Sequence, residues 1–418
     1  MQQMEFIMQK VKLHDICTLE RGSSPRPIQD YITTAKDGVN WIKIGDTNPN
    51  EKYVNKTAEK ITKEGAKKSR KVEIGDFILS NSMSLGHPFI MNINGYIHDG
   101  WFVLRPDYKK VNRDFLYYSL LSDYVQTQFK GTCTGSVVKN IRSELVNDLD
   151  IFLPDITEQK RISKVLSTID RKISVNREIN RNLEELAKQI YDYWFVQFDF
   201  PNEEGMPYKS SGGKMVWNET LKREIPAGWK NGVLSNIAYI TMGQSPEGSS
   251  YNEDGIGTIF YQGSTDFGIR FPNVRMYTTK PTRFAKIGDI LMSVRAPVGA
   301  MNIANSDCCI GRGLSAMNSK IGSITHLYYT MDYFRHTFEN KNAVGTTFGS
   351  ITKDELYNLP VVIPSKEVIS AFNVKTIYIF NQQLSTSKEI QELTALRDSL
   401  LPLLMNGQVT LNSCLSAD

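Results

Sequence analysis

The arrangement nearest to a catalytic motif in this 418-residue sequence is PDITEQK, residues 154–160. Its Pro-Asp followed by Glu-x-Lys has the order of side chains used by metal-dependent nucleases. In those enzymes the two parts normally lie on adjacent strands, whereas here both fall where a long helix is expected to begin. Asp155 and Glu158 have the spacing of a capping box, and carboxylates are favourable at the positive end of a helix dipole. We therefore interpret this motif as a helix start.

Other catalytic chemistry has no motif in the sequence. There is no Walker loop, GxGxxG, HExxH or Asn/Asp-Pro-Pro-aromatic tetrapeptide, the last of which adenine-amine methyltransferases need. The five histidines are scattered and predict no metal cluster. The five cysteines form no CxxC pair, so neither a disulfide framework nor a zinc site is indicated. We expect a chain that is not an enzyme and that holds no metal or cofactor of its own.

Arginines on loops bounded by glycine or proline are better candidates for binding a ligand. Arg295 lies in SVRAPVG and Arg312 lies in CIGRG. An arginine fork can make two parallel hydrogen bonds to guanine or phosphate, although each could equally be a structural loop residue. The basic segment 56–71 is either a solvated surface or a patch that contacts phosphates. The candidates for nucleic-acid contact are Arg21, Arg26, Lys67, Lys68, Arg70, Ser82, Lys139, Gln244, Arg295, Arg312 and Thr347.

These loops belong to an internal duplication. The segment VEIGDFILSNSMSLG, residues 72–86, reappears without a gap as AKIGDILMSVRAPVG, residues 285–299. The repeated glycines are more typical of turns than of ligand contacts. Each copy mixes short strand-like runs with turns and includes one helix-like piece, residues 113–129 in the first copy and 325–338 in the second. Without regular alternation of strands and helices, this pattern predicts a mixed α+β domain in each half.

A long run without glycine or proline follows each copy. In the first run, apolar residues recur at spacings of mostly three and four, which is typical of a coiled-coil seam: Ile162, Leu166, Ile169, Ile173, Ile179, Leu183, Leu186 and Ile190. Asn176 also falls on this seam, where a polar residue can fix the register of a helix pair. The apolar edge of the second run is formed by Ile377, Phe380, Leu384, Ile390, Leu393, Leu396 and Leu400. Because one stripe on a lone helix has nothing to pack against, we expect the two helices to bury each other.

An antiparallel pair would place the two domains at opposite ends of a helical spacer, related by a pseudo-two-fold. A parallel pair would put both domains at one end, and the sequence leaves both arrangements open. The expected boundaries are a first domain over 1–155, a first helix over 156–200, a connector over 201–230, a second domain over 231–364, a second helix over 365–407 and a tail over 408–418.

Composition adds weak constraints. The hydrophobic fraction of 40% allows a core in each half, and the net charge of +4 favours no particular partner. No segment approaches the ~18 uninterrupted apolar residues of a membrane span, and the first residues lack the architecture of a signal peptide. We therefore expect a cytoplasmic protein.

The chain resembles the specificity subunits of type I restriction–modification enzymes. The resemblance covers essentially the whole chain and rests on SVRAPVG, CIGRG, GSVVKNI, GTTFGSI, LPDITEQKRISKVLSTID, LAKQIYDYWFVQFDFP and LRDSLLPLLMNGQV. It implies two target-recognition domains, each reading one half of a split sequence in double-stranded DNA, joined by two antiparallel helices. The first half departs from the pattern at residues 81–83, where the second half has VRAP, so the two domains are expected to read different sequences.

The resemblance also implies partners. Two adenine methyltransferase subunits would be held by the helices, and motor–nuclease subunits would join for cleavage, with S-adenosylmethionine, ATP and magnesium acting in those partners. The candidate subunit-interface residues are Ile162, Leu166, Ile169, Tyr191, Trp194, Phe195, Leu393 and Leu400. Two rival interpretations remain, a specificity module of another restriction or methylation system and a coiled-coil scaffold that binds only proteins. The scaffold would not need duplicated loops rich in arginine and glycine.

Overall fold

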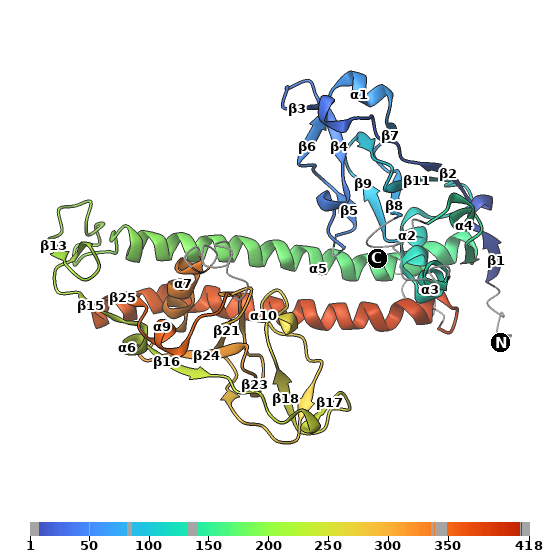
Figure 1. Cartoon of the computed structure of the whole chain (residues 1–418). Helices are drawn as coiled ribbons and strands as arrows, with labels where there is room; N and C mark the ends of the chain where they lie inside the picture. The colour runs from blue at the N-terminus through green and yellow to red at the C-terminus, as the bar shows by residue number, and fades with distance from the viewer. Residues whose placement is uncertain are drawn as a thin grey trace. The chain divides into compact units, whose positions relative to one another are not determined.

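The computed structural model describes residues 8–49, 51–81, 86–131, 141–335, 338, 349–409 and 411. The chain, drawn in Figure 1, divides into two compact units. Unit 1 comprises Met1–Ile173 and Glu392–Asp418, and unit 2 comprises Ser174–Gln391. Each unit therefore holds one copy of the duplicated domain together with part of both long helices, α5 (Ile156–Tyr191) and α10 (Lys366–Met405).

The domain of unit 1 is built from two five-stranded sheets, β2-β11-β8-β9-β5 and β3-β6-β4-β10-β7, and a two-stranded sheet, β1-β12. Its strands are β1 Gln9–Lys12, β2 Cys17–Arg21, β3 Ile32–Thr33, β4 Val39–Ile42, β5 Tyr53–Val54, β6 Glu59–Ile61, β7 Arg70–Val72, β8 Phe77–Ser80, β9 Pro88–Met91, β10 Gly95–Ile97, β11 Trp101–Pro106 and β12 Asp150–Leu153. Its helices are α1 Lys63–Lys67, α2 Arg113–Leu121, α3 Asp123–Gly131 and α4 Ser143–Asn147, with short turns η1 Leu13–Asp15, η2 Ile28–Asp30 and η3 Ile44–Asp46.

The core of unit 1 joins this domain to the long helices. Phe115 on α2 and Phe129 on α3 are fully buried in a cluster that also takes in Ile162 from the first turns of α5. Leu404 from the last turns of α10 belongs to the same cluster. Nearer the middle of α5, an ion pair joins Asp170 to Arg397 at 3.1 Å. Because ascending positions on α5 meet descending positions on α10, the two helix segments of unit 1 run antiparallel.

Unit 2 repeats the sheets in the orders β16-β24-β21-β22, β17-β19-β18-β23-β20 and β15-β25, and adds a hairpin, β13-β14, in the connector. Its strands are β13 Met215–Asn218, β14 Arg223–Pro226, β15 Lys230–Val233, β16 Ala238–Met242, β17 Tyr251–Asn252, β18 Thr258–Tyr261, β19 Tyr277–Thr278, β20 Phe284–Ala285, β21 Ile290–Ser293, β22 Met301–Ile303, β23 Cys308–Ile310, β24 Leu314–Ser319 and β25 Pro360–Ile363. Its remaining elements are α6 Leu234–Ile237, α7 Ile324–Tyr333, α9 Lys353–Tyr357, the π-helical turn η4 Asp192–Val196, η5 Gly248–Ser250 and η6 Ser264–Asp266.

The helices of unit 2 are also antiparallel, and part of their contact is polar. Asn176 donates to Glu389 over 2.7 Å, and Asn180 donates to Ser387 over 2.9 Å. Beyond these pairs, Gln383 donates to Glu184 over 2.8 Å. The prediction of a helix pair is thereby confirmed, and the antiparallel alternative is the one that each unit adopts.

The predicted seam of α5 needs a correction in unit 2. Ile179 and Leu186 are 38% and 45% exposed, whereas Asn176 and Ala187 are 2% and 1% exposed. Of the other predicted seam residues in this stretch, Leu183 and Ile190 are partly buried, as is Asn180. The prediction followed side-chain hydrophobicity, whereas polar hydrogen bonds join the helices in this stretch.

The duplication is reproduced in the backbone. The glycines of the repeated block have positive φ, +94° at Gly75 and +87° at Gly288, and +72° at Gly86 and +89° at Gly299. A Cβ at Gly86 would lie 2.4 Å from the ring of Phe129. All four glycines are therefore turn residues, as their conformational freedom predicts, and Gly86 is in addition packed against Phe129.

The helix-like piece expected over residues 113–129 is two helices. Ser122 separates α2 from α3 with an extended backbone, φ −61° and ψ 147°. Its hydroxyl donates to the carbonyl of Ser119 over 2.7 Å, and serine side chains compete with helical hydrogen bonds in this way. None of the helices in the described part of the chain is long and apolar enough to cross a membrane.

Candidate nucleic-acid interface

The nuclease-like motif at the start of α5 serves as a helix cap. One carboxylate oxygen of Asp155 accepts hydrogen bonds from the backbone N–H groups of Thr157 and Glu158 at 2.8 and 3.0 Å. Glu158 is buried and pairs with Arg161 at 3.4 Å. These partners match the structural interpretation of PDITEQK, because Asp155 caps the helix and the carboxylate of Glu158 is engaged by Arg161.

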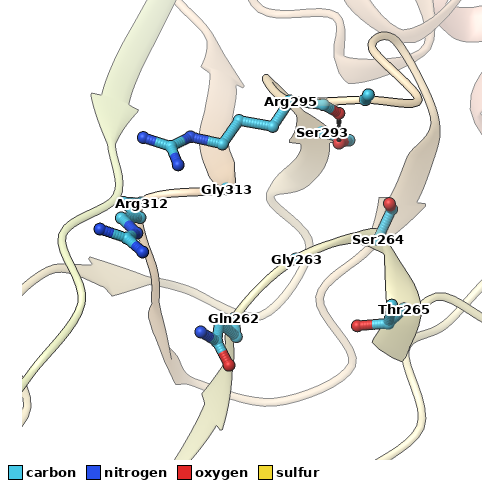
Figure 2. Close-up of a pocket in the computed structure, with 9 residues that line it drawn as sticks. Gln262, Gly263, Ser264, Thr265, Ser293, Arg295, Arg312 and Gly313 are labelled. Carbon is cyan, nitrogen blue, oxygen red and sulfur yellow. Dashed lines mark hydrogen bonds between the residues drawn. The ribbon is translucent and has the colours of Figure 1, made fainter. Parts of the chain in front are cut away.

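The site with the chemistry to bind a ligand is a pocket in the domain of unit 2. It has a volume of about 220 Å³ and is open to solvent. Three loops meet there, one following β18, one following β21 and one between β23 and β24 (Figure 2). The lining residues are Gln262, Gly263, Ser264, Thr265, Ser293, Arg295, Ala296, Arg312 and Gly313.

The loop that carries Arg295 is held from both sides. The hydroxyl of Ser293 donates to the carbonyl of Arg295 over 2.6 Å (Figure 2). The backbone N–H of Val294 donates to the carbonyl of Gly313 over 2.9 Å. The loop is therefore fixed at the pocket while the side chain of Arg295 extends from it.

The loop that carries Arg312 is held close to the loop after β18. A Cβ at Gly313 would lie 2.7 Å from the carbonyl oxygen of Gln262, and one at Gly311 would lie 3.0 Å from its Cα. The close approach of two backbones thus requires glycine at position 313 and leaves little room for a side chain at position 311. The N–H of Arg312 also donates to the hydroxyl of Ser245 over 3.3 Å.

Both arginine side chains are exposed and extend to the same side of the pocket, as Figure 2 shows. Across the ranges that the structure describes, no carboxylate forms an ion pair with either guanidinium. Gln262 lines the same pocket, and its amide can both donate and accept. Two forked donors next to an amide have the chemistry to recognise base edges or a phosphate.

The domain of unit 1 presents different groups at the equivalent positions. The offset of the duplicated block aligns Arg312 with Asp99, and the strand pairing aligns Gln262 with Lys43. Asp99 accepts a hydrogen bond from Ser24 over 2.8 Å and pairs with Arg26 at 3.4 Å. The hydrogen bond from Ser24 is the main reason that the pKa of Asp99 lies below its ordinary value.

The basic segment of the first domain is largely paired with acids. Lys67 lies 2.7 Å from Glu64, and the ammonium of Lys68 donates to the hydroxyl of Tyr31. Arg70 donates to the carbonyl of Arg21 over 3.2 Å and lies 3.5 Å from Glu20. These pairs reduce the local excess of positive charge, although Lys67 and Arg21 remain exposed.

The other residues predicted to contact DNA that the structure describes do not line the pocket in unit 2. Arg26 is 83% exposed at its side chain. Gln244 is exposed, and its backbone N–H donates to Ile310 over 3.0 Å, next to the loop that carries Arg312. Ser82, Lys139 and Thr347 lie outside the described residues.

Six of the eight predicted subunit-interface residues are buried within this chain, which argues against a direct contact with a partner. The exposed fraction is at most 9% for Ile162, Leu166, Ile169, Tyr191, Trp194 and Phe195. The first two belong to the core of unit 1 and the three aromatic residues belong to a core of unit 2. Leu393 and Leu400 are partly exposed. A hydrophobic pattern identifies a buried face but does not tell which partner covers it.

An exposed apolar stripe lies instead on another face of α5. Val175, Ile179 and Leu186 are 47%, 38% and 45% exposed, and Tyr193 in the following turn is 39% exposed. Their spacings of four and seven place them on one side of the helix. Sequence reasoning assigned Ile179 and Leu186 to the seam, and so missed this surface.

Sequence reasoning also missed Gln262 and Asp99. Gln262 follows a strand that the repeated block does not include, so no motif marked it. Asp99 could have been found by applying the offset of the repeat to Arg312.

Comparison with known proteins identifies relatives along most of the chain. The family model described as type I restriction modification DNA specificity domain matches residues 7–185 and again residues 226–395. The MjaX specificity subunit of a type I restriction enzyme from Methanocaldococcus jannaschii is 32% identical over 316 residues, covering 73% of this chain and 70% of the relative. The MjaIX specificity subunit from the same organism is 24% identical over 426 residues, covering 95% and 92%.

A solved structure shares the fold. The S subunit of a type I restriction–modification system from M. genitalium has a TM-score of 0.60 with this chain and 17% sequence identity. The likeness covers 96% of this chain and 97% of that one.

Proposed function

Because the chain belongs to the family of type I restriction modification DNA specificity domains, we propose that the pocket formed by Arg295, Arg312 and Gln262 reads base edges in one half of a bipartite DNA target. The observation that carries the proposal is the pair of exposed guanidinium groups on loops fixed by hydrogen bonds and close glycine packing. In the major groove each base pair presents a distinct pattern of donors and acceptors. An arginine fork matches the two acceptors of guanine, and a glutamine amide matches adenine.

The two domains are proposed to read the two half-sites independently. Each has its own sheets, core and loops, and the loops differ at the positions that would meet DNA. Exchanging residues 232–364 for the matching domain of a relative should change one half of the methylated motif and leave the other half unchanged. Sequencing of modified bases in cells that carry the cognate methyltransferase measures both halves at once. A change in both halves would contradict independent reading.

We further propose that the chain performs no chemistry and positions partner subunits. These would be two adenine methyltransferase subunits, which use S-adenosylmethionine, and motor–nuclease subunits, which use ATP and magnesium. Support comes from the names of the relatives and from the use of Asp155 as a helix cap. Purified chain incubated with S-adenosylmethionine, magnesium and DNA should leave the DNA unmodified, and reproducible methylation or cutting with contaminants excluded would overturn this role.

The exposed stripe on α5 is the proposed docking surface for a methyltransferase subunit. It consists of Val175, Ile179, Leu186 and Tyr193, all in unit 2, and it presents apolar area that this unit leaves exposed. Exposed apolar side chains that recur on one side of a helix are typical of protein contacts, because their transfer out of water is favourable. The same helix thus uses one face for its own core and another for the proposed partner.

A further inference from the structure

We propose that Asp99 and Arg312, which occupy the same position in the two domains, determine specificity and give the domains opposite hydrogen-bonding character towards DNA. The inference rests on the proposed function, since it requires that both domains read base edges. It extends that function to unit 1, where the described loops hold no counterpart of the arginine pair.

The equivalence of the two positions rests on the backbone. The N–H of Asp99 donates to the hydroxyl of Ser24 over 3.3 Å, and the N–H of Arg312 donates to that of Ser245 over the same distance. Each residue lies two positions after a strand that pairs in parallel, β10 with β4 and β23 with β18. The two side chains therefore leave their domains from matching points of the scaffold.

Arg312 supplies only donors at this point. Its guanidinium is always charged and has a rigid fork that matches carbonyl and ring-nitrogen acceptors side by side. Guanine offers these two acceptors in the major groove, and cytosine offers an amino donor in the same place. Arg312 should therefore favour guanine over the other bases at the position that it contacts.

Asp99 supplies only acceptors, since its carboxylate is ionised and held in place. Ser24 donates to one oxygen over 2.8 Å and Arg26 approaches the other at 3.4 Å, while 49% of the side chain stays exposed. A carboxylate is repelled by phosphates, so the DNA group that it can accept from is a base amino group. The amino group of cytosine is the usual partner of such a carboxylate.

The two domains also differ in the residue that follows β4 in unit 1 and β18 in unit 2. Lys43 in unit 1 stands where Gln262 stands in unit 2, and its ammonium lies 2.5 Å from Glu59. The backbone N–H of each residue donates to an aspartate of the following turn, Asp46 at 2.8 Å and Asp266 at 3.1 Å. In unit 1 the two matched loops therefore carry a cation, Lys43, and an anion, Asp99. In unit 2 the same loops carry an amide, Gln262, and a cation, Arg312.

The experiment uses the full chain with its methyltransferase and a library of random DNA sequences. Asp99→Asn keeps the shape of the side chain but replaces one acceptor by a donor, and Arg312→Gln removes the fork. Asp99→Asn should change the base preferred at one position of one half-site, and Arg312→Gln should do so at one position of the other. Discrimination at that position should fall by about 5-fold to 150-fold, the range of a good base contact. Asp123→Asn, an exposed carboxylate on α3, is the matched control and should leave the motif unchanged.

Failure of the proposed function and failure of the inference give different results. If the unaltered complex selects no bipartite motif, the proposed function itself fails. If the motif is selected but both variants preserve every base, or weaken all sequences equally, Asp99 and Arg312 are structural and the inference fails. Circular dichroism of each variant excludes unfolding, and Asp99→Glu, which keeps the charge, should retain the cytosine preference more closely than Asp99→Asn.

Discussion

The two domains of this chain share a scaffold and differ at its exposed loops. Gly86 and Gly299 make the same left-handed turn, and Asn112 and Ser323 cap corresponding helices. Arg312 and Asp99, by contrast, carry opposite charges at one backbone position. The difference shows that the left-handed turn and the helix cap are kept in both domains, whereas the exposed residue at this loop position is not. A protein that reads two unlike half-sites needs this combination.

The largest expected effect tests whether each unit depends on its own part of α10. Leu404 is 1% exposed in the core of unit 1, and Phe380 is 3% exposed in the core of unit 2. Replacing either by alanine should lower the free energy of unfolding by about 2–5 kcal/mol. Hydrogen exchange should rise in unit 1 for Leu404→Ala and in unit 2 for Phe380→Ala.

The matched control is Leu396→Ala on the same helix, because Leu396 is 46% exposed. Its effect should stay within about 0.5 kcal/mol. Equal hydrogen exchange in both units after either core substitution would mean that the chain unfolds as one body. It would contradict the claim that each unit depends on its own part of α10.

The next largest effect is a loss of stability at acid pH, and it comes from a position where the cores of the two domains differ. His326 on α7 corresponds to Phe115 on α2, three residues after the helix caps. It lies 4.6 Å from the ring of Phe195, between ring centroids, and burial lowers the pKa of His326 to about 3. Because the unfolded chain binds this proton near pH 6.5, the folded state loses stability as the pH falls below that value.

This effect should amount to about 2 kcal/mol between pH 7.5 and pH 5. The variant His326→Phe, which copies the residue of the first domain, should remove that part of the acid sensitivity. Thermal unfolding at the two pH values measures it. A variant as acid-sensitive as the parent chain would show that His326 does not titrate in this range.

A smaller effect compares the two faces of α5. The double variant Ile179→Asp and Leu186→Asp should leave the stability of the isolated chain nearly unchanged, since both side chains are exposed. It should weaken binding of the methyltransferase subunit by at least about tenfold, or ~1.4 kcal/mol. Ala187→Asp on the buried face should instead destabilise the chain. Normal recruitment by the double variant, measured by titration calorimetry, would exclude the stripe as the docking surface.

The sequence was sufficient to predict the duplication and the two long helices because both leave regular patterns. Repeated glycines mark the turns at Gly75 and Gly288, and runs without glycine or proline mark α5 and α10. The exposure of Ile179 and Leu186 in unit 2 could not be predicted from apolar spacing, because hydrogen bonds from Asn176 and Asn180 join the helices there. The pocket combines loops far apart in the chain, so Arg295 and Arg312 were identified singly while Gln262 was not.

The central claim is that the pocket in unit 2 contacts DNA through Arg295 and Arg312. The most direct measurement is a salt titration of DNA affinity for Arg295→Ala and Arg312→Ala in the methyltransferase complex, with the exposed Lys222→Ala as the control. At least one variant should lose about 1–3 kcal/mol and relax specificity at one base, as expected of a base contact. A phosphate contact would instead weaken all sequences alike and flatten the salt dependence by roughly one unit of slope. Affinity, specificity and salt slope unchanged in both variants would contradict the claim and show these loops to be structural.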